Sequence, residues 1–575
     1  MPERFDVAIL GGGLAGLTLA LQLKRSRPET SIVVAEKREG RAPEAAFKVG
    51  ESSVELAAYY FGKVCGLEDH IDSEQLEKNG LRFFFPAGDN SDITKRVEWG
   101  STKWLDVPSY QLDRGRFENE LADRCRAAGV ELLMGSFVDD VDLAPDGHAA
   151  TVVRGGPGGE RTRLEARWLV DATGRSFLLK RKLGLAKDVE HTINAAWFRL
   201  ANGLDIEEWG AHHEAWMARM AEPGLRKFST NHLMGEGYWV WLIPLASGSI
   251  SIGIVADPRF HPFAEFNTLE TAMDWLGRHE PQLASALAAR AADVKDFLKI
   301  EDFAHSCCKR VFSAERWCVT GEAGVFLDPF YSPGSDFIAI SNTFIGDLIE
   351  RDLAGEPIAE RTEAYNKLFL STYDLIIQTV YTDQYAGFGN VQVMQAKLVW
   401  DYLLYWSMNV LRYFHGKTCD LEFTQEVAPA IQRAAMLSFA TAQLFRDWNA
   451  VDQRPWQEAF VEARKFPAVW DRHVQLEAGY DDAALKQRIF DNTKLIEAVA
   501  VVLFHKAAEG AGLEVDAERE INPGAISLHP ERWEQDGLFE GPGLTLAAAR
   551  ELLPGFEHMW LDELAEQDAA QPAPA

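Results

Sequence analysis

Three glycines near the N-terminus have the spacing that binds a nucleotide pyrophosphate. Gly11, Gly13 and Gly16 follow the apolar run 5–10 in a G-x-G-x-x-G pattern, and a helical pattern begins directly after them. In such a turn the first glycine permits a tight bend, the second lets the backbone approach the phosphates, and the third lets helix and strand pack closely. The N–H groups at the start of the helix then face the anion. The segment therefore predicts a dinucleotide site.

A carboxylate follows the second predicted strand. Residues 31–35 read as a strand and end at Glu36, twenty residues after Gly16. A carboxylate at this place can accept hydrogen bonds from ribose hydroxyls. Because strand, spacing and acid agree, we expect a bound nucleotide rather than a glycine turn that binds nothing.

The elements that must position this turn follow a changing pattern along the chain. Helical and strand patterns alternate up to about residue 189, and strands at 195–200, 238–244 and 249–255 then indicate a second sheet. Residues 301–355 return to the nucleotide-binding pattern, and a helical, aromatic-rich region follows from about residue 356. The last residues, 565–575, are small, polar and Pro-containing, and we expect them to be disordered.

Composition excludes several classes of protein. The 575 residues are 47% hydrophobic and carry a formal charge of −29, which argues against nucleic acid or an anionic membrane surface as the main partner. The six cysteines form no C-x-x-C pair and no zinc-ligand spacing, so we expect no metal site and a reducing compartment. The first strand begins at residue 5, and no apolar stretch reaches the ~18 residues of a membrane span. We expect a cytoplasmic protein.

Four segments together resemble the flavoprotein monooxygenases of the hydroxybenzoate-hydroxylase type. They are the glycine turn with Glu36, Q-L-D-R at 111–114, D-A-T-G at 171–174, and G-E-A at 321–323 before Asp328 and Pro329. The resemblance covers about residues 5–350. It implies FAD as the cofactor, and Glu36 favours FAD over a nucleotide with a 2′-phosphate. In the family the acid of the last segment is usually aspartate and contacts the ribityl chain, and here it is Glu322.

Within that group the chain is most similar to the flavin-dependent halogenases. W-V-W-L-I-P at 239–244 reproduces their W-x-W-x-I-P motif, and V-G-E-S at 49–52 resembles their V-G-E-[AS] segment beside the flavin. Lys78, followed by Gly80 and aromatic residues, falls where the family has its catalytic lysine. The resemblance implies that Trp239, Trp241 and the motif's last residue, Pro244, belong to a shield that keeps the substrate from the flavin.

The resemblance implies an α/β fold with a Rossmann-like FAD-binding domain of the hydroxybenzoate-hydroxylase type. That domain is discontinuous, over 1–189 and 301–355, with a β-sheet substrate domain over 190–300 and a helical C-terminal region over 356–564. The expected cofactor-binding residues are Gly11, Gly13, Leu14, Ala15, Gly16, Glu36, Lys37, Lys48, Gly50, Glu51, Ser52, Gln111, Arg114, Asp171, Ala172, Thr173, Gly174, Gly321, Glu322, Pro329 and Gly334.

The family mechanism gives Lys78 a chemical task. Reduced FAD and oxygen convert a halide, chloride or bromide, to hypohalous acid, which travels through the protein to the lysine beside an aromatic substrate. An ammonium can hydrogen-bond the oxidant and a neutral amine can form a haloamine, and partial burial favours the neutral form by lowering the pKa. The chain has no second glycine turn, so we expect either a separate flavin reductase to supply reduced FAD or a nicotinamide to dock transiently.

The loop D-P-F-Y-S-P-G-S-D at 328–336 departs from the halogenase pattern. In the family two successive N–H groups after the serine bind the halide, and here the residue after Ser332 is Pro333, which has no N–H. Tyr331 replaces the carboxylate of the tryptophan-halogenating branch, which points away from tryptophan as the substrate. Asp336 could accept a proton from a substrate hydroxyl or position water, or it could cap the following helix, the commoner role for such an aspartate.

Three readings of the function therefore stay open. The first is a halogenase acting on a small aromatic or phenolic substrate, free or tethered to a carrier or peptide, with Lys78, Ser332 and Asp336 as catalytic residues. The second is an FAD-dependent monooxygenase that has lost the halide site at Pro333. The third is a flavin-binding partner without catalysis. Judged alone, Lys78 fits a surface lysine. The aromatics Tyr381, Tyr385, Phe388, Trp400, Tyr402, Tyr405 and Trp406 could line an aromatic pocket, and at helical spacing such residues more often form a core.

Overall fold

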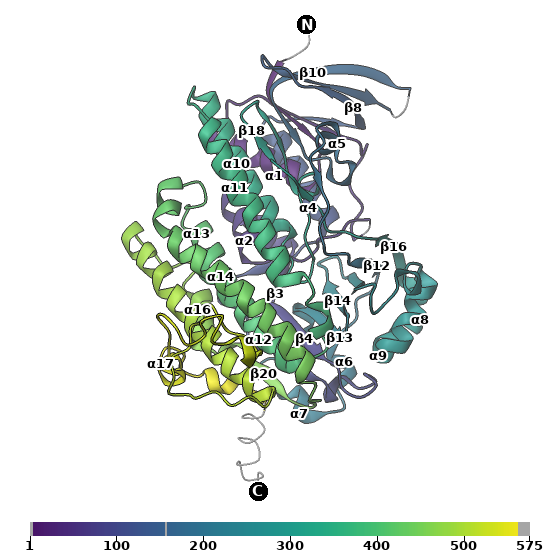
Figure 1. Cartoon of the computed structure of the whole chain (residues 1–575). Helices are drawn as coiled ribbons and strands as arrows, with labels where there is room; N and C mark the ends of the chain where they lie inside the picture. Colours follow the sequence, from purple (N-terminus) through teal and green to yellow (C-terminus); the bar gives the residue numbers. More distant parts are fainter. Residues whose placement is uncertain (1–3, 46, 156–157, 562–575) are drawn as a thin grey trace.

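The computed structural model describes residues 4–45, 47–155 and 158–561. The segment 565–575, for which the sequence predicts disorder, lies outside the described residues. A mainly parallel sheet lies near the N-terminus, a second sheet contains strands β12 (Asn194–Leu200) and β14 (Tyr238–Pro244), and a layer of long helices covers the opposite side (Figure 1). No helix within the described ranges combines the length and the hydropathy needed to cross a bilayer.

The first sheet has a parallel centre and an antiparallel extension. Residues 7–10 of β1 and 32–35 of β2 are apolar and buried, as expected for parallel strands that are covered on both faces. The main path through the sheet is β18 (Phe312–Ser313), β19 (Trp317–Val319), β10 (Glu160–Asp171), β1 (Arg4–Leu10), β2 (Ile32–Glu36) and β7 (Glu131–Met134), and β8 (Ser136–Asp142) and β9 (His148–Arg154) extend it beside β10.

The parallel order brings three loops to one edge of the sheet. The loops after β1, β10 and β19 begin at Gly11, Ala172 and Thr320, and the N–H of Thr320 donates to Asp171 O at 2.9 Å. Helices α1 (Leu14–Ser26), α4 (Arg114–Ala127) and α10 (Gly334–Leu353) pack beside this sheet. Ligands of open α/β sheets bind at such an edge, outside the carboxyl ends of the strands.

The second sheet contributes one face to the site. Successive residues of a strand point to opposite faces, so His232, Trp239 and Trp241 share one face while Leu233 and Val240 share the other. The second face packs on helices α8 (Leu269–His279) and α9 (Pro281–Ala288). The strand order is β16 (Val294–Ile300), β12 (Asn194–Leu200), β15 (Ile250–Ala256), β14 (Tyr238–Pro244), β13 (Thr230–Gly235), β4 (Leu81–Phe85), β5 (Val97–Gly100) and β20 (Phe460–Glu462).

The second sheet extends beyond the unit expected at 190–300. Strands β4, β5 and β20 come from residues 81–85, 97–100 and 460–462. Strand β4 is the aromatic segment after Lys78, and it joins the sheet by parallel pairing with β13. The boundaries at 190 and 300 stay a prediction, and the sheet they were meant to contain draws strands from three separate parts of the chain.

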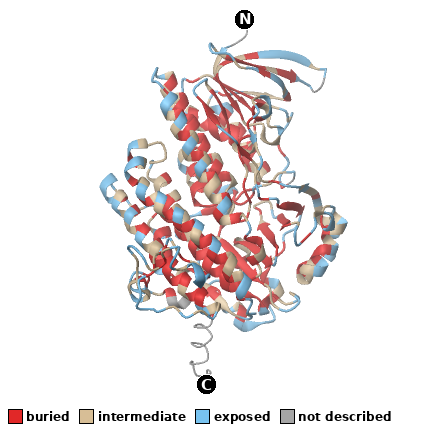
Figure 2. Cartoon of the chain, viewed as in Figure 1, coloured by how far each residue is buried: buried red, intermediate tan, exposed pale blue. Residues whose placement is uncertain are grey.

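The C-terminal region is helical, as expected, apart from β20. Its main helices are α11 (Ala359–Ile376), α12 (Val391–Leu404), α14 (Leu421–Val451), α15 (Pro467–Val474) and α16 (Asp482–Gly510). Two wider π-helical turns, Ile377–Tyr381 and Tyr405–Val410, continue α11 and α12. Such turns occur often at functional sites because they shift the direction of side chains. Figure 2 shows that the helices are buried along the faces that meet the two sheets.

Candidate active site

The glycine turn has the geometry that a pyrophosphate requires. Gly11 has φ of +112°, and a Cβ at this residue would lie 2.2 Å from Ala172 O. A Cβ at Gly16 would lie 2.1 Å from Gly11 O, so neither position accepts a larger residue. At Gly13 a Cβ would meet no atom within 4 Å, which leaves the backbone open to a ligand. The three glycines therefore have the separate roles that the motif predicts.

A cavity of about 420 Å³ extends from this turn to the second sheet. Its wall includes backbone from the loops after β1, β10 and β19 and indole rings from β14. This donor set suits a nucleotide with a flat aromatic ring, so the residues present fit FAD. Predicted residues that line it are Gly13, Leu14, Ala15, Lys48, Gly50, Glu51, Ser52, Arg114, Ala172, Gly174, Trp239, Trp241, Gly321, Glu322, Pro329, Ser332 and Gly334.

Several of the predicted cofactor or shield residues do not line this cavity. They are Gly11, Gly16, Glu36, Lys37, Gln111, Asp171, Thr173 and Pro244. Asp171 shapes its own loop by accepting the N–H of Thr173 at 2.9 Å and that of Leu179 at 2.7 Å. The Gln111 amide donates to Thr230 Oγ1 at 2.9 Å. Lys37 is exposed and Pro244 ends its strand half-buried. Their direct contact with a cofactor stays a prediction.

Glu36 ties the glycine turn to the neighbouring strand. Its Oε2 accepts the N–H of Gly12 at 2.7 Å, and its Oε1 accepts the N–H of Arg38 at 2.9 Å. Each oxygen keeps further acceptor capacity. The carboxylate is therefore held in place beside the turn, and its contact with a ribose stays a prediction.

Charged groups at the cavity wall are paired with one another. Glu118 is buried between Lys48, at 3.1 Å, and Arg114, at 2.7 Å. Burial alone would raise the pKa of Glu118, and the two cations outweigh that effect and lower it. Glu322 pairs with Arg175 at 2.9 Å. The expected cofactor contacts Lys48, Arg114 and Glu322 thus belong to ion pairs, which orient them toward the cavity without a ligand.

Trp239 is fixed by a chain of buried hydrogen bonds. Its Nε1 donates to Tyr385 OH at 3.0 Å, and that hydroxyl donates to Asp328 Oδ2 at 2.6 Å. His191 Nε2 lies 2.8 Å from the same carboxylate oxygen. Trp241 follows on the same face, with ring centroids 5.7 Å apart. The two indoles form a rigid aromatic wall of the first cavity.

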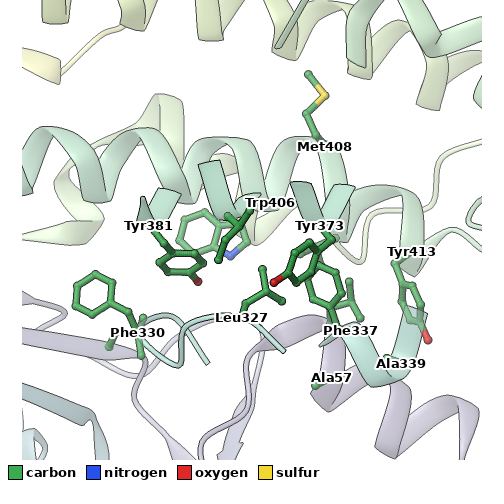
Figure 3. Packing of buried hydrophobic residues seen from close by; sticks show 14 of the residues in the cluster. Ala57, Leu327, Phe330, Phe337, Ala339, Tyr373, Tyr381, Trp406, Met408 and Tyr413 are labelled. Carbon is green, nitrogen blue, oxygen red and sulfur yellow. The ribbon is translucent and has the colours of Figure 1, made fainter. Parts of the chain in front are cut away.

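A second cavity of about 180 Å³ lies on the other side of the loop 328–336. Its walls come from the segments around 54–56, 78–81 and 99–109 and from the helices between 372 and 470. Aromatic and aliphatic side chains dominate, among them Tyr381 and Trp406. In Figure 3 these two rings point from the C-terminal helices toward the segment that carries Leu327 and Phe330. The cavity has the size and apolar walls of a pocket for a small aromatic molecule.

Lys78 lines the second cavity and is only 1% exposed, so the surface interpretation of this lysine is wrong. It ends the short strand β3 (Leu76–Lys78), which pairs with β6 (Ser109–Gln111). Its Nζ donates to Ser53 O at 2.7 Å and to Ser52 Oγ at 3.0 Å. Burial lowers the pKa of Lys78 to about 7, although the carboxylates of Glu55 and Asp336 pull it upward. Ser52 lines the first cavity, so this one hydrogen bond joins the walls of both cavities.

Asp336 does not cap its helix. Helix α10 begins after Pro333 without a side-chain cap bond, and the Asp336 carboxylate accepts the N–H of Ala57 at 3.0 Å and the hydroxyl of Tyr405 at 2.7 Å. The capping interpretation is wrong because the side chain points away from its own helix toward α2 (Glu55–Tyr59). Burial raises the pKa of Asp336 to about 7. Asp336 lines the second cavity with Lys78, whereas Ser332, the third expected catalytic residue, lines the first.

Two residues line both cavities and form the partition between them: Pro333 and Phe337. The backbone reverses just before them, where Ser332 has φ of +60°. Tyr331 points to the second cavity, and its hydroxyl donates to Asp401, which also pairs with Lys397 at 2.8 Å. The two cavities therefore share the side chains of Pro333 and Phe337 as part of their walls.

Sequence reasoning missed several side chains of the second cavity. Asn79 and Glu55 carry no motif, and only the position of Asn79 beside Lys78 indicated its place in the site. Tyr381, Tyr402, Tyr405 and Trp406, aromatics that the sequence offered either as core or as pocket lining, do line this cavity. His232, on the wall of the first cavity, was also missed. Burial lowers the pKa of His232 to about 3, so the ring is neutral.

Comparison with known proteins agrees with this geometry. A family model described as an FAD binding domain matches residues 4–249. Flavin-dependent halogenase chlA of Dictyostelium discoideum is 28% identical over 444 residues, covering 72% of this chain and 71% of the relative. A 1H-pyrrole-2-carbonyl-(peptidyl-carrier protein) chlorinase of Pseudomonas fluorescens is 24% identical over 363 residues, covering 60% of this chain and 76% of the relative.

Solved structures share the fold. The crystal structure of halogenase PltM has a TM-score of 0.58 at 18% identity and covers 86% of this chain and 97% of that chain. A flavoprotein/dehydrogenase from Cytophaga hutchinsonii has a TM-score of 0.54 at 20% identity, covering 69% of this chain and 89% of that chain. The FAD binding domain model and these relatives identify the chain as an FAD-dependent oxidoreductase. Among known proteins the chain is similar to flavin-dependent halogenases.

Proposed function

We propose that this chain uses reduced FAD and oxygen to halogenate a small aromatic or phenolic substrate held beside Lys78. One observation carries the proposal. Next to the FAD cavity lies an apolar second cavity, whose wall carries the buried Lys78 with a pKa of about 7, hydrogen-bonded to Ser52 on the wall of the FAD cavity. An oxidant made in one cavity can then be used in the other, and the halogenases among the relatives support this use.

Each part of the site has a separate role in this proposal. Bound FAD in its reduced form supplies the two electrons that activate oxygen for oxidation of a halide. Trp239 and Trp241 keep an aromatic substrate out of the first cavity because their rings fill its wall. Lys78 receives hypohalous acid at Nζ, and near neutral pH the amine has the neutral fraction needed to bond the halogen.

Asp336 is the candidate proton acceptor in the second cavity. Ring halogenation releases a proton from the carbon that takes the halogen, and a carboxylate with a raised pKa can hold it. Its pKa of about 7 suits that task near neutral pH, and its hydrogen bonds from Ala57 and Tyr405 fix its position. Ser332 lies on the cofactor side of the partition, where it belongs to the loop that faces the halide.

The halide site is incomplete compared with the family pattern. Pro333 supplies no N–H, so the anion must rely on Gly334 and Ser335, which begin α10 and line the FAD cavity. The first N–H groups of a helix have no intrahelical partner and favour an anion. Pro333 is also the observation that favours the second candidate function, hydroxylation by the same FAD site.

Reduced FAD and the substrate come from outside this chain in our proposal. A separate flavin reductase supplies the reduced cofactor, since one nucleotide-binding turn is present in the sequence. The substrate is a free ring or one tethered to a carrier, as in the name of the pyrrole chlorinase.

The experiment is turnover with chemically reduced FAD, oxygen, bromide and a panel of phenols and indoles, read by mass spectrometry. Wild type is expected to form brominated phenols, and Lys78→Met is expected to lower their rate by about a hundredfold or more while FAD still reoxidises. Lys180→Met is the matched control, because Lys180 is also buried with a lowered pKa but lines neither cavity. Oxygenated products without bromine would support hydroxylation and refute the proposal.

A further inference from the structure

The second cavity contains a buried amide without a partner. Asn79 is 1% exposed and lines this cavity directly beside Lys78. Its backbone is fully engaged: the N–H donates to Phe228 O at 3.0 Å, and the carbonyl accepts from Ser229 Oγ at 2.8 Å. Neither Nδ2 nor Oδ1 of its side chain finds a hydrogen-bond partner within the described residues. A buried amide without a hydrogen-bond partner lowers the stability of the folded protein, so contacts within the fold do not explain the asparagine at this position.

Two indoles on the same cavity share this state. Trp99, on β5, and Trp406, in the π-helical turn after α12, line the cavity and are almost completely buried. The Nε1–H of each also lacks a hydrogen-bond partner among the residues that the structure describes. Indoles that are buried usually place this donor against an acceptor. The cavity therefore presents three unpaired donor groups, one amide and two indoles, and one unpaired amide oxygen.

The charges around the cavity restrict the ligand further. Glu55, Asp336 and Asp401 line it, and Lys78 is the one basic side chain among its described lining residues. Asp401 pairs with Lys397 at 2.8 Å, Glu55 lies 3.2 Å from His473, and burial raises the pKa of Asp336 to about 7. Burial also lowers the pKa of Lys78 to about 7, so an anionic substrate would lose its hydration in this low-dielectric site without a full positive charge among the described lining residues to pair with. The unpaired atoms of the cavity would be satisfied by a ligand with more hydrogen-bond acceptors than donors. The charges around the cavity favour a neutral ligand.

We propose that Asn79 is the specificity-determining residue of the second cavity and that it pairs with a hydroxyl group of a neutral, oxygen-rich aromatic ring. A phenolic hydroxyl can donate to Oδ1 and accept from Nδ2, and further ring oxygens can accept from Trp99 and Trp406. The pairing places the ring next to Lys78, the preceding residue on the same wall. This inference rests on the proposed function, because it takes the second cavity as the substrate site.

The test compares two ligands of equal shape, resorcinol and m-xylene, in which hydroxyl groups are replaced by methyl groups. Binding to the FAD-loaded protein is measured by saturation-transfer NMR, together with kcat/KM for bromination of resorcinol. Wild type is expected to prefer resorcinol, and Asn79→Leu is expected to reduce that preference by about tenfold to a hundredfold. The loss of preference measures the amide–hydroxyl pairing itself, as in a double-mutant cycle.

A matched variant separates this role from a structural one. Gln395 is a fully buried amide with an unpaired oxygen, and it lines neither cavity, so Gln395→Leu is expected to leave the preference for resorcinol unchanged. Asn79→Leu is expected to melt at or above the wild-type temperature, because an apolar side chain replaces an unpaired amide. A structural role for Asn79 predicts the opposite, a lower melting temperature.

Each outcome decides between the alternatives. An unchanged preference in Asn79→Leu, or an equal loss in Gln395→Leu, overturns the inference. If wild type prefers resorcinol, Asn79→Leu loses that preference, and no brominated product forms in either, the assignment of Asn79 stands and the proposed halogenation fails. If wild type brominates resorcinol and Asn79→Leu does so with the same kcat/KM, the proposed function stands and the role of Asn79 fails.

Discussion

The two cavities are built in different ways. The FAD cavity is lined in large part by loops that follow strands, and Gly13, Ala172 and Gly321 in these loops are expected to bind the cofactor through their backbone. The second cavity is lined by side chains from segments scattered between residues 54 and 470, and two π-helical turns aim its aromatic rings. We therefore expect ligand binding in the FAD cavity to depend on backbone geometry, and ligand binding in the second cavity to depend on its side chains.

The difference shows where specificity belongs in this molecule. Backbone geometry at the FAD cavity depends on a few glycines, so most substitutions there abolish binding rather than alter it. The second cavity is bounded by Tyr381, Trp406 and other large rings whose replacement would reshape the walls. We therefore expect substitutions in the C-terminal helices to alter substrate choice more than FAD binding.

The largest expected effect comes from Gly13→Val. A Cβ at Gly13 meets no protein atom within 4 Å, and its φ of −88° suits any residue, so we expect the chain to fold normally. The added side chain occupies the approach to the pyrophosphate, and FAD affinity should fall at least about a hundredfold. Equilibrium dialysis of FAD and a melting curve of the FAD-free protein measure the two quantities.

Gly16→Val is the contrasting variant, because its Cβ would lie 2.1 Å from Gly11 O and should destabilise the FAD-free protein itself. Normal FAD binding by Gly13→Val would show that the pyrophosphate does not approach this turn.

Opening the partition should weaken the separation of the cavities. Phe337→Ala removes one of the two side chains that line both, and truncation of a buried phenylalanine costs about 3–5 kcal/mol of stability. We also expect the yield of brominated product per reduced FAD to fall by about tenfold, because oxidant and substrate no longer meet only at Lys78.

Phe344→Ala on the same helix is the control. Phe344 is similarly buried but lines neither cavity, so this variant should lose stability and keep the yield per reduced FAD. Equal yields in both phenylalanine variants would mean that Phe337 is no partition.

Restoring the missing N–H should strengthen halide binding. Pro333 has φ of −76°, which alanine adopts without strain, so Pro333→Ala adds a donor and leaves the loop in place. One hydrogen bond to an anion should lower the KM for bromide by about tenfold. Pro357→Ala is the control: Pro357 is exposed and lines neither cavity, so this variant is expected to leave that KM unchanged. A rise in oxygenated product with no change in bromide KM would instead favour hydroxylation.

The pH dependence tests the coupling of Lys78 with Asp336. The pKa of Lys78 is about 7, below its ordinary value, so the neutral amine increases as pH rises through 7 and bromination should rise with it. Anionic Asp336 raises this pKa, so Asp336→Asn should move the rising limb to lower pH by up to about one unit.

Glu77→Gln is the control for charge. Glu77 is next to Lys78 in the chain but exposed, and it is not among the groups that shift the pKa of Lys78. A rising limb that moves equally in both variants would remove Asp336 from this role.

The sequence predicted the cofactor side better than the substrate side for a physical reason. Gly11, Gly13 and Gly16 meet local constraints of one turn, and Trp239 and Trp241 share a strand face by simple alternation. Both are set by spacing along the chain.

Asn79 and Asp336 meet their surroundings through contacts with distant segments, which spacing does not encode. The Asp336 carboxylate bonds Ala57, 279 residues away, and this contact overrides the local preference for capping. Strand β20 pairs with β5 across more than 350 residues of sequence. It is only three residues long, which is too short for a strand pattern to be recognised in the sequence.

The most direct test of the central claim is a single turnover with reduced FAD, bromide, a phenol and oxygen labelled with oxygen-18. If the substrate stays in the second cavity and only an oxidised halide reaches it, the product contains bromine and no oxygen-18. A product that contains oxygen-18 and no bromine would mean that the ring reaches the FAD cavity, and it would contradict the separation of the two cavities.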